Sequence, residues 1–147
     1  MVNPNSAARR LLCCIAAVAS VGVLGGCGGA KKTSLSVSLS EWKVGAGVTT
    51  FDHGMQTLRI TNAGKAPHEL LVFKPAAGID PHNLPVSADG DINENSPDAK
   101  KISDGDNVDP GKSQTRTVDF STPGTYVLLC NIAGHYKQGM SQVVTVK

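Results

Sequence analysis

From residue 35 onward, the sequence predicts an all-β domain built as a sandwich or a barrel. In several short segments apolar and polar residues alternate, which is the pattern of a strand with one buried face. Gly, Pro and Asn residues that favour turns separate these segments. No segment after residue 35 repeats apolar residues at the spacing of an amphipathic helix. Short strands divided by turns are typical of two packed sheets or of one closed sheet.

The individual strands follow from local patterns. In the first segment, 35–40, three apolar residues alternate with three serines. The segment 69–74 contains an uninterrupted apolar run from Leu70 to Phe73, which suits a strand buried on both faces. In chain order, we expect strands at 35–40, 57–61, 69–74, 115–120, 126–129 and 142–146.

Residues 75–112 interrupt this succession of short strands. They include five prolines and are rich in Asp, Asn, Ser and Gly. The segment is therefore too polar to build a core of its own and too long to be a simple turn. We expect a solvated excursion across one side of the domain, with one helical turn near residues 97–101. Its acidic residues do not follow the pattern of an EF-hand calcium loop.

The first 26 residues have the organisation of a secretory signal peptide. A polar segment ending in Arg9-Arg10 precedes an apolar run that is closed by small residues. The run is shorter than the roughly 20 apolar residues of a membrane-spanning helix, which disfavours a transmembrane anchor. The four residues from Leu24 to Cys27 resemble a bacterial lipobox, whose cysteine is acylated after cleavage. The expected organisation is a signal peptide at 1–26, a lipidated Cys27 with a tether at 27–34, and one domain at 35–147.

The charge balance disfavours a nucleic-acid-binding protein. The chain has 14 Lys and Arg residues against 12 Asp and Glu residues, and Arg9 and Arg10 leave with the signal peptide. The mature chain is then balanced, so no basic excess remains to form a nucleic-acid-binding face. Its length of roughly 120 residues is enough for one domain with its own core.

Cys130 is the strongest indication of function. Two of the four cysteines belong to the signal peptide and Cys27 is expected to be lipidated, so Cys130 has no disulfide partner in an oxidising compartment. It begins the pattern Cys-x4-His-x4-Met, with His135 and Met140 between the last two expected strands. A thiolate, an imidazole and a thioether together select copper. A blue-copper site needs a second histidine, and His68 stands where a turn meets a buried strand.

Beyond these ligands, the chain resembles the cupredoxin family, and most closely its sulfocyanin and rusticyanin branch. The family implies a Greek-key β-sandwich and outer-sphere electron transfer on one type 1 copper that alternates between Cu(I) and Cu(II). On this resemblance the equatorial ligands are His68, Cys130 and His135, and Met140 is the weak axial ligand. The resemblance is carried by Glu41 to Val44, the turn at 62–64, His68, the Pro-Gly-Thr-Tyr turn at 123–126, the loop from Cys130 to His135, and Gly139-Met140.

The chain departs from the family pattern at two positions beside the expected site. Ala133 stands where relatives often have proline, so the ligand loop is expected to be less rigid. Glu69 follows the first histidine, where several relatives have Asn or Ser. In the family this position helps to orient the loop that carries the thiolate, and such hydrogen bonds tune the metal.

Other aromatic and imidazole side chains have simpler expected positions. We expect His53 and His82 in surface loops, and Trp42 and Tyr126 in the core. His135 is expected to reach the surface at one end of the domain. The apolar patch around it, where redox proteins would dock transiently, is expected to consist of Ala66, Pro67, Ala133 and Tyr136.

Together these features predict a monomeric, extracytoplasmic electron-transfer protein and not an enzyme. Its lipid would anchor it to a bacterial cell membrane, facing a periplasm or the outside of the cell. Multicopper oxidases carry histidines beside the ligand cysteine, whereas Cys130 is flanked by Leu129 and Asn131. The alternative is an extracytoplasmic copper chaperone or storage protein. Such proteins use exposed clusters of Met, His or Cys, but Met55 and Met140 are the only methionines after the signal peptide.

Overall fold

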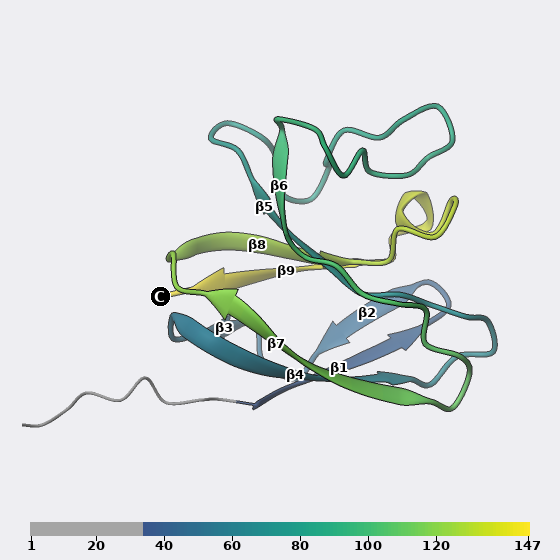
Figure 1. The fold of residues 1–147 in the computed structure, drawn as a ribbon. Coiled ribbons are helices and arrows are strands. Elements are labelled where there is room, and N and C mark those ends of the chain that lie inside the picture. The colour runs from purple at the N-terminus through teal and green to yellow at the C-terminus, as the bar shows by residue number, and fades with distance from the viewer. Residues whose placement is uncertain (1–33) are drawn as a thin grey trace, which may run out of the picture.

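The computed structural model describes residues 34–147, which form two β-sheets packed face to face (Figure 1). The strands are β1 (Ser34–Ser40), β2 (Lys43–Ala46), β3 (Thr50–Phe51), β4 (Gly54–Asn62), β5 (Leu71–Pro75), β6 (Ala99–Ser103), β7 (Ser113–Phe120), β8 (Gly124–Leu129) and β9 (Ser141–Val146). One sheet has the order β2-β1-β4-β7 and the other the order β3-β9-β8-β5-β6. A short 3-10 helix, η1 (Tyr136–Gln138), lies between β8 and β9. The all-β prediction is confirmed, and the domain is a sandwich.

All six predicted strands are present, but the helical turn predicted at residues 97–101 is wrong. Those residues lead into β6, which pairs antiparallel with β5. The expectation relied on local sequence alone. Pairing with the open edge of β5 satisfies the backbone of β6, and this tertiary contact outweighs local preference.

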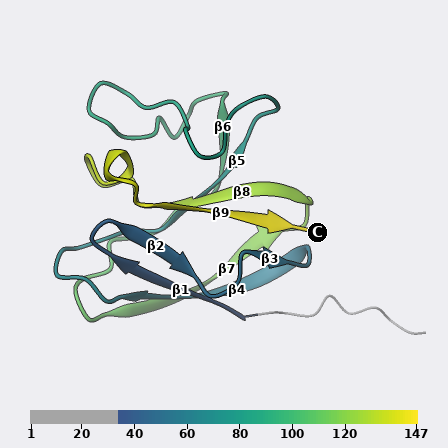
Figure 2. The same ribbon diagram turned by 180° about the vertical axis from the view of Figure 1, so that it is seen from behind.

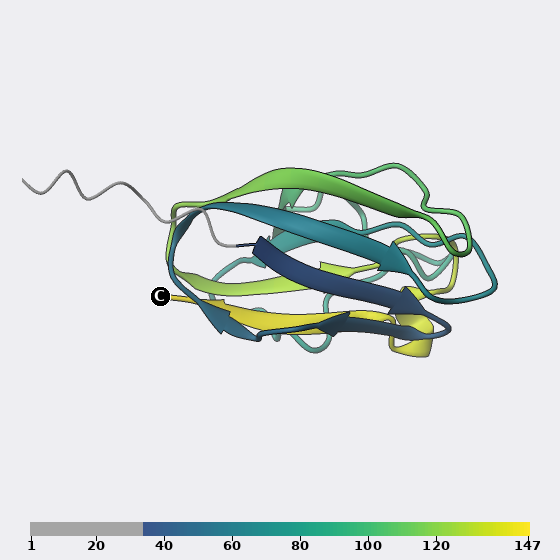
Figure 3. The same ribbon diagram turned by 90° about the horizontal axis from the view of Figure 1, so that it is seen from below.

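The main core lies between the two sheets and follows the predicted alternation. In β1 the apolar residues Leu35, Val37 and Leu39 are buried, whereas the serines between them face outward. β1 runs parallel to β4, which places Leu35 beside Leu58 and Val37 beside Ile60. Figure 3 shows β1 and β4 side by side in this sheet. Because each strand buries every second residue, the two inner faces together supply the apolar core.

A second core lies on the outer face of the five-stranded sheet. Leu71 and Phe73 of β5 belong to it, whereas Leu70 and Val72 point into the main core, so the prediction of a strand buried on both faces is confirmed. The excursion covers this face and contributes three nearly buried side chains to the second core: Leu84, Ile92 and Ala99. The excursion does cross one side of the sandwich, but the expectation that it is only a solvated loop is wrong. Three widely spaced apolar residues leave no periodic pattern in the sequence, yet their burial attaches the segment to the sheet.

The connections β1–β2, β4–β5, β6–β7 and β8–β9 gather at the end of the sandwich opposite the C-terminus (Figures 1 and 2). The signal peptide at 1–26, Cys27 and the tether up to residue 33 lie outside the described residues, and Ser34 is the first residue of β1. Within residues 34–147, no helix has both the length and the apolar composition needed to cross a membrane.

Candidate metal centre

Three of the predicted ligands converge at this end of the sandwich. His68, Cys130 and His135 each offer one ligand atom, and all three atoms lie within 4.8 Å of one another. The Nδ1 atom of His135 is 3.3 Å from His68 Nδ1 and 3.3 Å from Cys130 Sγ. All three residues are buried. His68 is 67 positions away from His135 in the sequence, yet their rings meet. Two imidazoles and one thiol form the trigonal donor set expected for copper.

Cys130 points inward because it continues the alternation of β8. Tyr126, Leu128 and Cys130 all belong to the main core. The chain then turns sharply and returns as β9, held by a hydrogen bond from the Cys130 N–H to the Met140 carbonyl at 3.1 Å. Gly139, just before Met140, has a φ of 94°, a backbone conformation that favours glycine. The sequence of this connection therefore brings Cys, His and Met back to one place.

His68 is fixed by its backbone on one side and by a carboxylate on the other. Its N–H and carbonyl form an isolated bridge with Val108, at N···O distances of 3.2 and 2.6 Å. Its buried Nε2 atom has no hydrogen-bond partner, but Glu41 Oε1 lies 3.5 Å away. A carboxylate in this position favours the proton on Nε2 and leaves the Nδ1 lone pair free for a metal.

Glu41 is ionised and held in place. Its Oε1 atom accepts hydrogen bonds from the N–H groups of Lys65 at 2.6 Å and Ala66 at 2.7 Å. Hydrogen bonds from its own N–H and from these two lower the pKa of the Glu41 carboxyl to about 2. Sequence reasoning used Glu41 only among the residues that carry the family resemblance and missed this role, because the contact depends on how two distant turns meet.

The environment of the thiol matches the expectation for position 69. The Glu69 N–H donates to Cys130 Sγ at 3.4 Å, and a carboxylate oxygen of Glu69 accepts the Asn131 N–H at 3.1 Å. Glu69 thus connects the sulfur to the residue that follows it, despite the departure from Asn or Ser. Burial raises the pKa of the Glu69 carboxyl.

Burial also sets the protonation of the metal-free ligands. It raises the pKa of the Cys130 thiol, and it lowers the pKa of the His135 imidazole with a smaller contribution from nearby His68. The imidazole is therefore neutral near pH 7 and free to bind a metal. The thiol has to lose its proton when a metal binds, so metal binding releases protons.

Met140 lies directly beside these ligands. Its side chain is fully buried in the main core, and its N–H donates to the His135 carbonyl at 3.2 Å. The backbone of Met140 is thus hydrogen-bonded to two of the ligands, Cys130 and His135, and the thiol and the two imidazoles fit a single type 1 copper. The role of Met140 as the axial ligand stays a prediction.

The surroundings of His135 differ from the expected patch in two residues. Trp42 is 39% exposed and stands edge-on to His135, with ring centroids 4.8 Å apart, so its predicted place in the core is wrong. Tyr136 is only 8% exposed, and its hydroxyl accepts the Leu84 N–H at 2.8 Å. The tyrosine faces the second core and not the solvent. His135 is 9% exposed and lies against Trp42, so it reaches the surface less than predicted.

The predictions for His53, His82 and Tyr126 are confirmed. His53 and His82 are exposed. Tyr126 is buried in the main core, and its hydroxyl donates to the Thr122 carbonyl at 2.6 Å.

Comparison with known proteins agrees with this site. The sulfocyanin (SoxE) domain family matches residues 52–147, a range that includes all four predicted ligands. None of the curated proteins matches the chain. Reduced auracyanin from the photosynthetic bacterium Roseiflexus castenholzii is 26% identical with a TM-score of 0.54, over 81% of this chain and 99% of auracyanin.

Two more distant structures share the fold. Rusticyanin from Thiobacillus ferrooxidans is 18% identical with a TM-score of 0.54, over 79% of this chain and 78% of rusticyanin. A multicopper oxidase from Campylobacter jejuni is 12% identical with a TM-score of 0.52, over 79% of this chain but only 30% of the oxidase. The likeness to rusticyanin and auracyanin confirms the predicted Greek-key sandwich.

Proposed function

The chain belongs to the sulfocyanin family of cupredoxins, and from this premise we propose that it is a blue-copper protein that carries single electrons. The observation that carries the proposal is the convergence of His68, Cys130 and His135 in a buried cluster at one end of a rigid sandwich. Met140 is proposed as the weak axial ligand. Copper in this site would take one electron from a donor as Cu(II) and pass it to an acceptor as Cu(I).

The protein contributes to this transfer by restricting the motion of the ligands and by excluding solvent from them. The backbone of His68 is hydrogen-bonded to Val108, and the Cys130 N–H donates to the Met140 carbonyl. The buried ligand side chains keep water away from the metal site. Ligands and solvent therefore rearrange little when the copper gains or loses an electron. Glu41 contributes a fixed negative charge beside His68, which favours the more positive oxidation state.

The burial of the ligands favours an electron carrier over a copper chaperone. Copper-loaded protein is expected to show an intense visible band that disappears with ascorbate and returns with ferricyanide, with one electron per chain. A chelator is expected to remove the copper slowly, because the site is closed. Rapid loss of copper to the chelator, or a colourless copper complex, would contradict the proposal and favour copper handling.

Catalysis by this chain alone is not expected. A multicopper oxidase needs a trinuclear centre with many histidines, and this chain has four histidines in total. Two of them, His68 and His135, are in the cluster, and the other two are exposed and apart from it.

We propose that redox proteins dock around Trp42. This indole contacts His135, and Pro67 and Ala133 are the exposed members of the patch expected from the sequence. Exposed tryptophans are frequent binding hot spots. Trp42→Ala is expected to slow electron transfer with a small redox protein by roughly tenfold, as the loss of about 1.4 kcal/mol of binding would. Stopped-flow absorption measures the rate.

Val48 offers a matched control for this substitution. It is an apolar side chain of similar exposure, 48% against 39% for Trp42, and it follows β2, which leads away from the site. Val48→Ala is expected to leave the rate unchanged. Equal rates for the two variants would contradict docking at Trp42.

We also propose that the protein is held at a membrane outside the cytoplasm. The lipobox-like segment from Leu24 to Cys27 supports acylation of Cys27. Two acyl chains on one cysteine hold a protein to a bilayer stably, whereas a single chain does not. Cys27→Ala is expected to move the protein from the membrane fraction to the soluble extracytoplasmic fraction, which cell fractionation and immunoblotting measure. An unchanged membrane fraction would rule out this anchor.

A further inference from the structure

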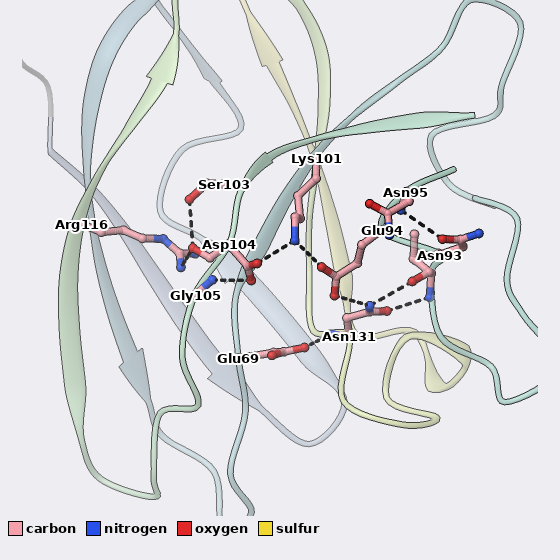
Figure 4. Close-up of polar contacts among 11 residues, drawn as sticks. Glu69, Asn93, Glu94, Asn95, Lys101, Ser103, Asp104, Gly105, Arg116 and Asn131 are labelled. Carbon is pink, nitrogen blue, oxygen red and sulfur yellow. Dashed lines mark hydrogen bonds and ion pairs between the residues drawn. The ribbon is translucent and has the colours of Figure 1, made fainter. Parts of the chain in front are cut away.

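Residues 91–94 of the excursion are hydrogen-bonded to the loop that carries Cys130 and His135. The side chain of Asn131, the residue after Cys130, makes three hydrogen bonds, all to residues 92–94 (Figure 4). Its Oδ1 accepts the Ile92 N–H at 2.7 Å, and its Nδ2 donates to the Ile92 carbonyl at 3.0 Å and to Glu94 Oε1 at 3.1 Å. A side-chain amide offers both the acceptor and the donor that pair here with the N–H and the carbonyl of Ile92.

A second contact holds the same loop next to His135. The Gly134 N–H donates to Asp91 Oδ1 at 3.0 Å. Asn131 follows one ligand and Gly134 precedes the next, so the two contacts restrain the segment between the sulfur and the imidazole. The excursion therefore restrains the copper loop from outside the loop itself.

Residues 91–94 are themselves attached to the second core and to β6. Ile92 is 3% exposed and packs in the second core, and its backbone forms an isolated bridge with Val86. Glu94 also pairs with Lys101 of β6, which pairs in turn with Asp104 (Figure 4). A contact with such a segment can therefore transmit the rigidity of the sheet to the loop.

We propose that Asp91, Ile92 and Glu94 form a clamp that keeps the copper loop in one shape in both oxidation states, with Asn131 as the positioning residue. The inference rests on the proposed electron-transfer function. The clamp contributes no ligand, so copper still binds when it is removed. The loop is then freer to change shape when the copper is reduced, and each electron transfer is slower.

The test compares Asn131→Ala with Asn93→Ala in the copper-loaded protein. Asn93 lies in the same segment, and its side chain accepts only the Asn95 N–H, so Asn93→Ala removes a local bond without touching the copper loop. Asn131→Ala is expected to lower the electron self-exchange rate roughly tenfold, equivalent to about 1.4 kcal/mol in the barrier. It is also expected to change the relative heights of the thiolate-to-copper absorption bands. NMR of mixed oxidised and reduced protein measures the exchange rate.

A second pair of variants leaves residues 130–140 intact. Asp91→Ala removes the acceptor for Gly134, whereas Asp91→Asn retains one. If Asn131→Ala does not fold, the same loss of rate is expected for Asp91→Ala and not for Asp91→Asn.

The outcomes separate the clamp from the proposed function. If the wild-type protein shows no thiolate-to-copper band, the proposed function fails and the clamp fails with it. If the wild-type protein shows the band, equal exchange rates and equal spectra for Asn131→Ala and Asn93→Ala overturn the clamp alone. An equal loss of rate in both variants also overturns it, because the effect would then be a general loosening of the segment.

Discussion

Cys130→Ser is expected to abolish the intense visible absorption of the copper-loaded protein. The band requires charge transfer from a thiolate to copper, and Cys130 is the sole cysteine in residues 34–147. A serine hydroxyl is a poor ligand for Cu(I), so reversible electron transfer is expected to be lost as well. The measurement is the visible spectrum and a redox titration of the variant after addition of Cu(II).

Two controls accompany this prediction. Circular dichroism shows whether the serine variant is folded, since it buries a hydroxyl in the main core at a cost of about 1–3 kcal/mol if unpaired. His53→Ala removes an exposed histidine outside the cluster and is expected to leave the band unchanged. An unaltered band in folded Cys130→Ser protein would show that the copper is bound elsewhere.

Leu84→Ala is expected to cost about 2–5 kcal/mol of unfolding free energy, the range for removing a buried leucine side chain. Leu84 is 2% exposed and packs in the second core, between the excursion and the five-stranded sheet. Domains of this size are stable by only about 5–15 kcal/mol, so the loss is large. Urea unfolding of the metal-free protein measures it without the added stability of bound copper.

Val86 provides the matched control two residues away. It lies in the same excursion but is 38% exposed. Val86→Ala is therefore expected to change the stability by less than about 0.5 kcal/mol. Equally small losses for the two variants would mean that the excursion does not pack on the sheet in solution.

The fold was predictable because alternation is a local property. In β1 serines alternate with three apolar residues, and four apolar residues, Leu70 to Phe73, follow one another at the start of β5. The sequence of each segment by itself therefore indicates whether one face of the strand is buried or both. The excursion was not predictable in this way: its attachment depends on Leu84 and Ile92, which have no periodic relation to each other and belong to one core only through the fold.

The site was predictable as far as it depends on the types of ligand residues and their spacing in the sequence. The spacing of Cys130, His135 and Met140 indicates copper because all three lie on one connection, and His68 follows from the need for a second imidazole. The converging atoms of His68, Cys130 and His135 agree with that prediction. The expected positions of Trp42 and Tyr136 were wrong, because an aromatic side chain carries no local sign of whether it will be exposed or buried.

The sequence by itself thus determined the all-β class, most of the strands, the donor residues and the metal that they prefer. The tertiary structure decided what surrounds those donors: Glu41 beside His68, Trp42 against His135, and Asp91 and Asn131 joining the copper loop to the excursion. The physical reason is the range of the interactions. Strand patterning and ligand spacing arise within about ten residues, whereas the contact between Asn131 and Ile92 joins residues 39 positions apart and exists only once both cores have formed.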